Sequence, residues 1–484
     1  MDGETICWMP ARAMAAAIAA GDLTATAVLE AHLDRIARVN PMVNAIVTLD
    51  ADGARARARA ADAAVARGDA LGPLHGLPVA VKDLEDAAGM RTTYGSAIFA
   101  DHVPDADSLM VARLRAAGAI VIGKTNTPEL GAGSQTFNPV FGATRNPYDL
   151  DRTCGGSSGG AAVAVACGMV PIADGSDLGG SVRNPPAFCS VVGLRPSPGA
   201  IAADVEGGDP WESLSVYGPI ARTVDDAALL FGALAGDDPR DPRSVPAPAD
   251  ALDPIGEGRA VGDLRVGWSE RLGDLPVEGA IRDVLRAARA RLADAGARVE
   301  DAEPDLRDAD EAFDVLRALG FATGIAPLAA EHPGRLKDTI IYNLEKGLAL
   351  TGARIGSAQR ARERAFTAMR AFLAGDGFDV LALPVTQALP FSVDVPYPTA
   401  IDGVEMEDYV AWMRSCSRIT VTGHPAISVP AGFTTDGLPV GLQLVGRHRG
   451  ERDLLAVARA VERTLDAARR PPLVDRRAQD RNSE

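Results

Sequence analysis

The sequence predicts an α/β fold, because segments with the apolar spacing of helices alternate with segments that have the composition of strands. The chain of 484 residues is 47% hydrophobic, which is enough to bury a sizeable core. The strands expected after residue 375 fit as additions to one sheet. We therefore expect a single domain over residues 1–468, with helices on both faces of the sheet. Residues 469–484 are polar and Arg-rich and are expected to form a frayed tail.

The N-terminal part is expected to form a layer of two antiparallel helices. Residues 24–39 place apolar side chains on one helical face, and Asn40-Pro41 should end that helix. Residues 50–67 form the second helix, which is rich in Ala and Arg. Residues 77–83 then have the β-branched content of a strand that ends in the charged pair Lys82-Asp83. Ligands often gather at such strand ends.

A helix over 108–117 and a strand over 119–122 lead into a long tract, residues 125–160, with little periodicity of either kind. Structureless connections longer than about 12 to 15 residues are usually functional or disordered. The aromatic and Asn-Pro content of this tract favours an ordered, functional segment.

Alternation of helices and strands resumes after residue 219. The expected helices span 225–235, 281–295, several segments within 308–374, 407–419 and 452–467, and the expected strands span 264–268, 379–383, 426–430 and 441–445. Only residues 237–260, rich in Asp and Pro, resemble a linker.

The composition excludes several classes of partner and cofactor. Lys and Arg number 49 against 65 Asp and Glu, a net charge of −16, so we expect neither nucleic acid nor an anionic membrane as partner. The acidic N-terminus lacks the layout of a signal peptide. Five cysteines without short spacings argue against disulfides and against a zinc site. We expect a cytoplasmic protein with no metal and no cofactor.

The first chemical motif is the Gly-Ser cluster over residues 154–160, which runs into an apolar helix. One interpretation is a Gly-rich turn with a Ser cap. The G-x-S-x-G spacing around Ser157 is also typical of a nucleophile elbow, but an elbow needs an apolar strand before it, and residues 149–153 are polar. A third interpretation is that backbone N–H groups and hydroxyls gather at a helix N-terminus to form part of a site.

A second cluster, residues 174–183, places two glycines before Ser181. Such glycines let consecutive N–H groups approach a developing oxyanion. A serine nucleophile needs a base, and no histidine occurs between His102 and His332. Lys82 is the candidate, because partial burial would lower its pKa toward a useful value. Read alone, Lys82 is also compatible with an ordinary ion pair at the end of a strand.

Residues 76–196 resemble the amidase signature family. The matching segments are GLPVAVKD around Lys82, GKTNTPELGAGSQTFNPVFGATRNPYD from Gly123, CGGSSGGAAVAVACG from Cys154 and DGSDLGGSVRNPPAFCSVVGLRPSPG from Asp174. The resemblance continues more thinly through 218–227 and 425–446, and the spacing of Lys82, Ser157 and Ser181 agrees with the family. The resemblance implies a mixed central sheet covered by helices, with residues 76–196 as its signature core.

The resemblance also implies a Ser-cisSer-Lys triad that hydrolyses a carboxylic amide. Ser181 would be the acylated nucleophile, Ser157 the bridging serine after a cis peptide bond at Gly156, and Lys82 the neutral base. The backbone N–H groups of Leu178, Gly179, Gly180 and Ser181 would form the oxyanion hole. Asp177 and Arg183 would brace the loop, a role that an ordinary ion pair would also fill.

The substrate pocket and the biological role stay open in the sequence. Candidate pocket residues are Gly133, Phe137, Trp211, Gln387 and Trp412, although each of the aromatic residues could equally belong to the core. A small-molecule amide is the expected partner, and a homodimer is one option. Two alternatives are the glutaminase subunit of a tRNA-dependent amidotransferase and an idle binding protein on the same fold. Arg195-Pro196-Ser197 replaces the Lys-Pro-Thr usual in that subunit, which favours the free-standing enzyme.

Overall fold

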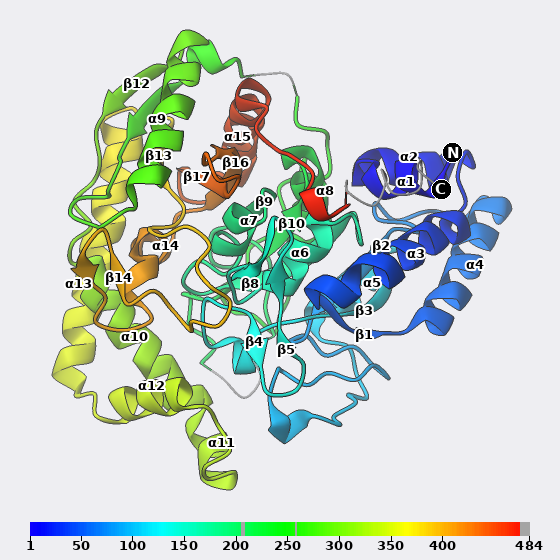
Figure 1. Ribbon diagram of the computed structural model, residues 1–484, viewed down its shortest axis with the longest axis horizontal. Coiled ribbons are helices and arrows are strands. Elements are labelled where there is room, and N and C mark those ends of the chain that lie inside the picture. The colour runs from blue at the N-terminus through cyan, green and yellow to red at the C-terminus, as the bar shows by residue number, and fades with distance from the viewer. Residues whose placement is uncertain (205–208, 257–258, 475–484) are drawn as a thin grey trace.

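The computed structural model describes residues 1–204, 209–256 and 259–474 (Figure 1). An 11-stranded sheet runs through the molecule in the order β1-β3-β2-β8-β10-β9-β16-β17-β13-β11-β12. Its strands are β1 Ile46–Leu49, β2 Pro78–Lys82, β3 Ile120–Thr125, β8 Ile172–Asp177, β9 Val192–Arg195, β10 Val216–Ala221, β11 Arg265–Trp268, β12 Arg298–Asp301, β13 Val380–Pro384, β16 Ala426–Phe433 and β17 Pro439–Val445. The strands expected after residue 375 do join the sheet that β2 and β3 help to form.

The sheet is mixed. Strand β2 is parallel to both β3 and β8, and β11 is parallel to both β12 and β13. The remaining neighbours are antiparallel. Because β2 and β8 are parallel neighbours, their carboxyl ends, at Lys82 and Asp177, lie at the same edge of the sheet.

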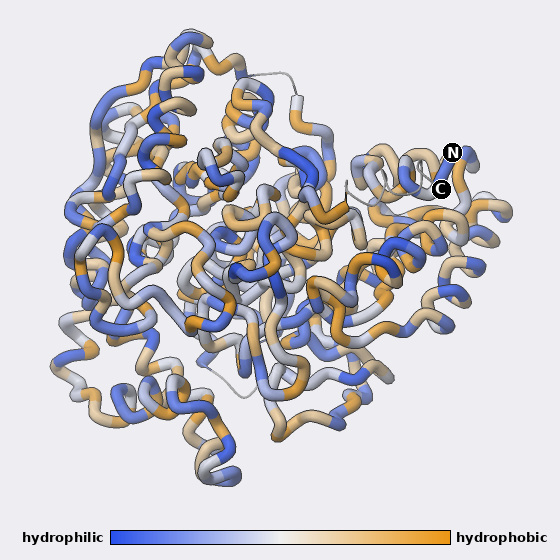
Figure 2. Tube along the Cα trace, in the orientation of Figure 1, coloured by the Kyte–Doolittle hydropathy of each residue, from blue (hydrophilic) through white to orange (hydrophobic). Residues whose placement is uncertain are grey.

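Helices cover both faces of this sheet (Figure 1). They are α1 Gly3–Trp8, α2 Ala11–Ala20, α3 Ala25–Val43, α4 Ala51–Arg67, α5 Leu109–Ala116, α6 Gly159–Ala166, α7 Asn184–Phe188, α8 Val224–Leu234, α9 Gly279–Asp294, α10 Ala309–Gly324, α11 Ala326–Glu331, α12 Asp338–Leu348, α13 Gly352–Arg370, α14 Arg414–Thr422 and α15 Glu451–Leu465. Along α3, hydrophobic and hydrophilic patches alternate, as expected for a helix with one buried face (Figure 2).

Two helix boundaries differ from the prediction. Helix α3 continues through Pro41 to Val43, because the burial of Val43 and the left-handed cap at Asn44 offset the one backbone hydrogen bond that proline cannot make. The helix expected over 407–419 begins only at Arg414. Before it, the Asp408 carboxylate accepts hydrogen bonds from the N–H groups of Val410 and Ala411 and holds the chain in a turn.

The tract over 125–160 is ordered by asparagine side chains. It contains the short strands β4 Phe137–Asn138, β5 Gly142–Ala143, β6 Arg145–Asn146 and β7 Asp149–Thr153. Asn126, Asn138 and Asn146 hydrogen-bond to backbone groups of the tract and so replace a regular ladder. Polar side chains that bond to the backbone in this way explain why neither periodicity is visible in the sequence.

Helices α1, α2 and α7 and strands β1, β8, β9, β10 and β12 were not predicted. The boundaries of the single domain stay a prediction, and the expected tail lies mostly beyond Val474, outside the described residues. Within the described ranges, no helix combines the length and the apolar character needed to cross a bilayer.

Candidate active site

Lys82 ends strand β2 with its side chain fully buried. Its Nζ lies 2.8 Å from Ser157 Oγ, 3.0 Å from Ser158 Oγ and 3.0 Å from Ser176 Oγ. Burial lowers the pKa of Lys82 to about 8, although the nearby carboxylates of Asp174, Glu85 and Asp177 act in the opposite direction. A lysine in this setting is partly neutral near pH 8 and can take a proton from a hydroxyl group.

Ser157 and Ser158 lie immediately before helix α6, and the peptide bond between Gly156 and Ser157 is cis. Glycine is required at position 156, because a Cβ there would lie 2.8 Å from the backbone nitrogen of Gln135. Ser134 Oγ donates a hydrogen bond to the Gly156 carbonyl over 3.1 Å. The Gly-Ser cluster is therefore held against the long tract over 125–160.

Ser181 lies in the loop between β8 and α7 and is partly exposed. In the described part of the chain, its hydroxyl makes no hydrogen bond. The structure therefore brings Lys82 and Ser157 together but leaves the contact between Ser157 and Ser181 open. Such contacts are often long without substrate and tighten when the substrate binds.

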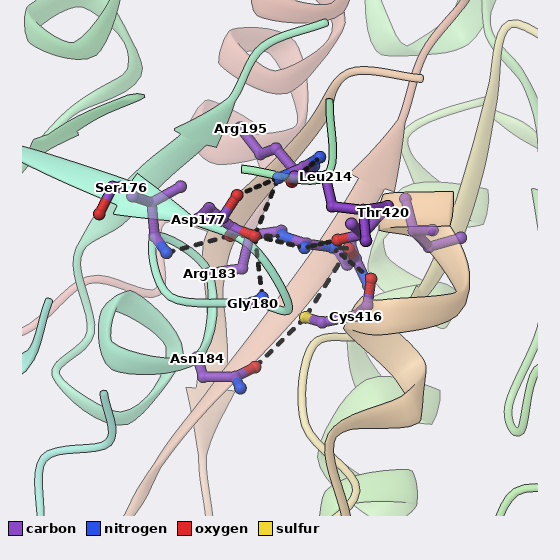
Figure 3. A network of polar contacts seen from close by, with 12 residues as sticks. Ser176, Asp177, Gly180, Arg183, Asn184, Arg195, Leu214, Cys416 and Thr420 are labelled. Carbon is purple, nitrogen blue, oxygen red and sulfur yellow. Dashed lines mark hydrogen bonds and ion pairs between the residues drawn. The ribbon is translucent and has the colours of Figure 1, made fainter. Parts of the chain in front are cut away.

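Asp177 organises the loop that carries Ser181 (Figure 3). Its Oδ1 accepts the Gly180 N–H over 2.8 Å, and its Oδ2 accepts the Val182 N–H over 3.0 Å. The Gly180 N–H therefore already donates to Asp177, whereas the family resemblance implied that it would belong to the oxyanion hole. The N–H groups of Leu178, Gly179 and Ser181, the rest of the predicted set, have no hydrogen-bond acceptor among the described residues.

Two buried arginines hold Asp177. Arg183 donates to both carboxylate oxygens, over 2.9 and 3.0 Å, and Arg195 NH1 lies 3.1 Å from Oδ1. Burial alone would raise the pKa of Asp177, but the two guanidinium groups overcome it and hold that pKa below its ordinary value. Because Asp177 stays ionised, the loop around Ser181 keeps its two N–H contacts across the working pH range.

Arg183 also ties this loop to the C-terminal quarter of the chain. Its guanidinium donates to the Cys416 carbonyl over 3.0 Å, to Thr420 Oγ1 over 2.8 Å and to Gln443 Oε1 over 2.7 Å (Figure 3). Arg195 NH2 donates to the Leu214 carbonyl over 2.8 Å. The brace therefore joins β8, β9, α14 and β17 at one buried point.

The predicted pocket residues are spread over several places. Gly133 and Phe137 both lie near Lys337, whose Nζ is 5.8 Å from the centre of the Phe137 ring. Trp412 is buried between Phe188 and Phe391.

The two remaining pocket candidates are Gln387 and Trp211. The Gln387 side chain is buried and hydrogen-bonded to Pro276 and Ser415. Trp211 lines a different cavity, away from Lys82.

Sequence reasoning missed two residues that contact Lys82 and one that contacts Asp177. Asp174 Oδ1 accepts the Lys82 backbone N–H over 3.0 Å, Ser176 contacts the ammonium group, and Arg195 joins the brace. Asp174 and Ser176 are two positions apart on β8, and alternate residues of a strand share a face. After the apolar residues Ile172 and Ala173, β8 carries polar residues at alternate positions. This pattern was the signal that could have revealed Asp174 and Ser176. Among the described residues, no cluster of His, Cys, Asp or Glu is arranged to hold a metal ion.

Comparison with known proteins gives consistent matches over nearly the whole chain. A family model described as Amidase matches residues 27–455. An acylamidase of Rhodococcus erythropolis is 36% identical over 474 residues, 98% of this chain and 98% of that protein. One subunit of the glutamyl-tRNA(Gln) amidotransferase of Acidothermus cellulolyticus is 38% identical over 478 residues, 93% of each chain.

Solved structures give the same result. A bacterial aryl acylamidase of the amidase signature enzymes superposes with a TM-score of 0.88 at 28% identity, covering 95% of this chain and 97% of that chain. The 6-aminohexanoate cyclic dimer hydrolase complexed with substrate superposes with a TM-score of 0.84 at 30% identity, covering 97% and 99%.

Proposed function

We propose that this chain, because it belongs to the amidase signature family of amide hydrolases, cleaves its substrate through an acyl-enzyme formed on Ser181. In this proposal Lys82 is the base and Ser157 relays the proton. The observation that carries the proposal is the 2.8 Å contact between Lys82 Nζ and Ser157 Oγ inside the protein. The pKa of Lys82, lowered to about 8 by burial, gives the base a neutral form at accessible pH.

The proposed reaction has two halves. Neutral Lys82 takes the proton of Ser157 as Ser157 takes the proton of Ser181, and Ser181 Oγ bonds to the amide carbonyl carbon. The C–N bond then breaks, and the proton returns through Ser157 to the leaving nitrogen. Water attacks the acyl-enzyme by the same path and releases the acid. The N–H groups of Leu178, Gly179 and Ser181 would stabilise the oxyanion, while Gly180 holds the loop through Asp177.

We propose a free-standing enzyme rather than a component of an amidotransferase. The acylamidase relative matches this chain over 98% of both lengths. Arg195-Pro196-Ser197 stands where the resemblance to the glutaminase component would have Lys-Pro-Thr, and the net charge of −16 is unfavourable for contact with tRNA. We further propose a small-molecule amide as substrate, a cytoplasmic location and, as one option, a homodimer.

The test uses a fluorophosphonate probe together with a panel of aryl, aliphatic and cyclic amides and free glutamine. Wild-type protein should be labelled at Ser181 and should release amine or ammonia from at least one amide. Ser181→Ala should lose both labelling and turnover, Lys82→Ala should lose turnover, and the control Ser357→Ala on helix α13 should keep both. Turnover confined to glutamine would favour the amidotransferase alternative. Labelling at another serine, or an active Ser181→Ala protein, would remove the assignment of the nucleophile.

A further inference from the structure

A cavity of about 670 Å³ lies beside helix α13. It opens between helix α13, the end of helix α14 and the loops around residues 198, 211–213, 242–245 and 448–449. Its volume falls within the range of sites that hold small molecules. Neither Lys82, Ser157 nor Ser181 lines this cavity. One link to the proposed active site is indirect, because Ser213 in its wall precedes Leu214, whose carbonyl accepts a hydrogen bond from Arg195.

The charge of the cavity is opposite to that of the protein. Although the chain carries a net charge of −16, three arginines line the cavity: Arg243, Arg362 and Arg449. Arg243 is paired with Asp241. Glu363 is the one acidic residue among the described lining residues, and it accepts a hydrogen bond from Thr367 on its own helix. The cavity therefore has more guanidinium groups than carboxylates.

Arg362 lacks an ion-pair partner among the described residues. It donates to Ser213 Oγ over 2.5 Å and forms no ion pair with any carboxylate in the described ranges. Burial lowers the pKa of Arg362; nearby Glu212 opposes this shift, and the neighbouring guanidinium of Arg243 adds to it. A bound carboxylate would satisfy the planar donor fork of Arg362 and relieve its repulsion from Arg243.

Flat apolar groups lie beside these charges. The Trp211 side chain is 68% exposed at the cavity, which is unusual for a residue of its size. Phe366 forms another wall, with its ring centre 5.5 Å from that of His448. Pro198, Pro242, Val245 and Val421 complete the apolar lining. A ligand with an aromatic body could therefore cover Trp211 while its charge meets Arg362.

We propose that this cavity is a second ligand site, which binds a small aromatic monocarboxylate with the carboxylate at Arg362 and the ring against Trp211 and Phe366. The site is independent of the proposed catalytic residues. It follows from the shape of the cavity, its excess of guanidinium groups and its exposed tryptophan.

The test is a fluorescence titration of the full-length protein with phenylacetate, with 2-phenylethanol as the uncharged comparison. Saturable quenching by phenylacetate is expected in the wild type and is expected to vanish in Trp211→Phe, which assigns the signal to this cavity. Arg362→Met should weaken phenylacetate binding by about tenfold or more. Arg360→Met is the matched control, since Arg360 is an exposed residue of the same helix that does not line the cavity. Calorimetric titration measures the same affinities without relying on Trp211.

Several outcomes would overturn the proposal. Equal binding of phenylacetate by Arg362→Met and wild type, with both proteins melting at similar temperatures, would exclude the guanidinium contact. Equal affinity for 2-phenylethanol would show an apolar pocket without a role for charge. Quenching that persists in Trp211→Phe would place the ligand elsewhere. A change of sedimentation coefficient in Arg362→Met would show that the cavity is a contact between copies of this chain.

Discussion

Lys82 Nζ lies 2.8 Å from Ser157 Oγ, where the end of strand β2 meets the start of helix α6. The contact joins the one buried lysine of β2 to a hydroxyl group in a setting with no histidine. Two further serine hydroxyls, those of Ser158 and Ser176, lie 3.0 Å from the same nitrogen. A buried amine surrounded by hydroxyl groups can exchange protons with them at little geometric cost.

The rate of hydrolysis should depend on the neutral form of Lys82. Because the pKa of Lys82 is lowered to about 8, kcat/KM should rise with pH, reach half of its maximum near pH 8 and level off about one unit higher. The measurement is a pH–rate profile on an uncharged amide between pH 5 and pH 10. A profile that stays flat down to pH 5 would contradict a lysine base.

The charge of Asp174 should help to set the pH at which the rate of hydrolysis rises. Its carboxylate accepts the Lys82 N–H over 3.0 Å, and its negative charge raises the pKa of Lys82. Asp174→Asn keeps a hydrogen-bond acceptor and removes the charge, so the rising limb should move toward lower pH, by about one unit or less. Asp52→Asn, at a fully exposed side chain, is the control. A shift toward higher pH would show that Asp174 does not act through its charge.

Burying Lys82 should reduce the stability of the folded protein. Its pKa is lower in the folded protein than its ordinary value of 10.5, so the unfolded chain holds more protons between about pH 8 and 10.5. The free energy of unfolding of the wild type should therefore rise with pH in that window. Below pH 8 the full destabilisation caused by the buried Lys82 should be present.

Lys82→Met removes the penalty, and we expect this inactive variant to gain up to about 3 kcal/mol over the wild type at pH 7. The gain should shrink as pH rises from 8 to 10.5. Urea unfolding at several pH values, with Lys346→Met on helix α12 as control, measures the difference. A constant difference between wild type and Lys82→Met across that window would argue against a lowered pKa.

Arg183 should be essential to the stability of the fold and to the loop that carries Ser181. Arg183→Met leaves the buried Asp177 carboxylate with Arg195 as its remaining ion-pair partner, and breaking one side of a buried pair costs about 3–5 kcal/mol. The exposed pair Arg307–Asp305 is the control, since Arg307→Met should lower the free energy of unfolding far less than Arg183→Met. Urea unfolding and kcat measured on the folded fraction check both expectations. Similar losses for the two variants would contradict a buried brace.

The residues proposed for catalysis could be named from the sequence because they stand in short, local motifs. Lys82, Ser157 and Ser181 stand in Gly-rich or strand-end segments that can be read without the fold. Asp174 and Ser176 escaped because β8 carries a glycine and three polar residues, so its strand periodicity is hidden.

The candidate pocket residues could not be placed in advance, because their surroundings come from distant parts of the chain. Trp412 is buried between Phe188 and Phe391, whereas Trp211 is exposed at another cavity. Both are large aromatic residues outside the segments that carry the family resemblance. Which of two aromatic residues becomes core depends on tertiary packing that sequence spacing does not encode.

The contacts of Arg183 have a consequence for how the protein is made. Lys82 and Ser157 belong to the first third of the chain, but three of the groups that fix Arg183 belong to Cys416, Thr420 and Gln443. A nascent chain leaves the ribosome from its N-terminus, so the loop around Ser181 gains these supports only when translation is nearly complete. A truncated product that stops before residue 416 would carry all three proposed catalytic side chains and still lack the frame that orients its nucleophile. We therefore expect activity only after the segment that contains Cys416, Thr420 and Gln443 has been synthesised.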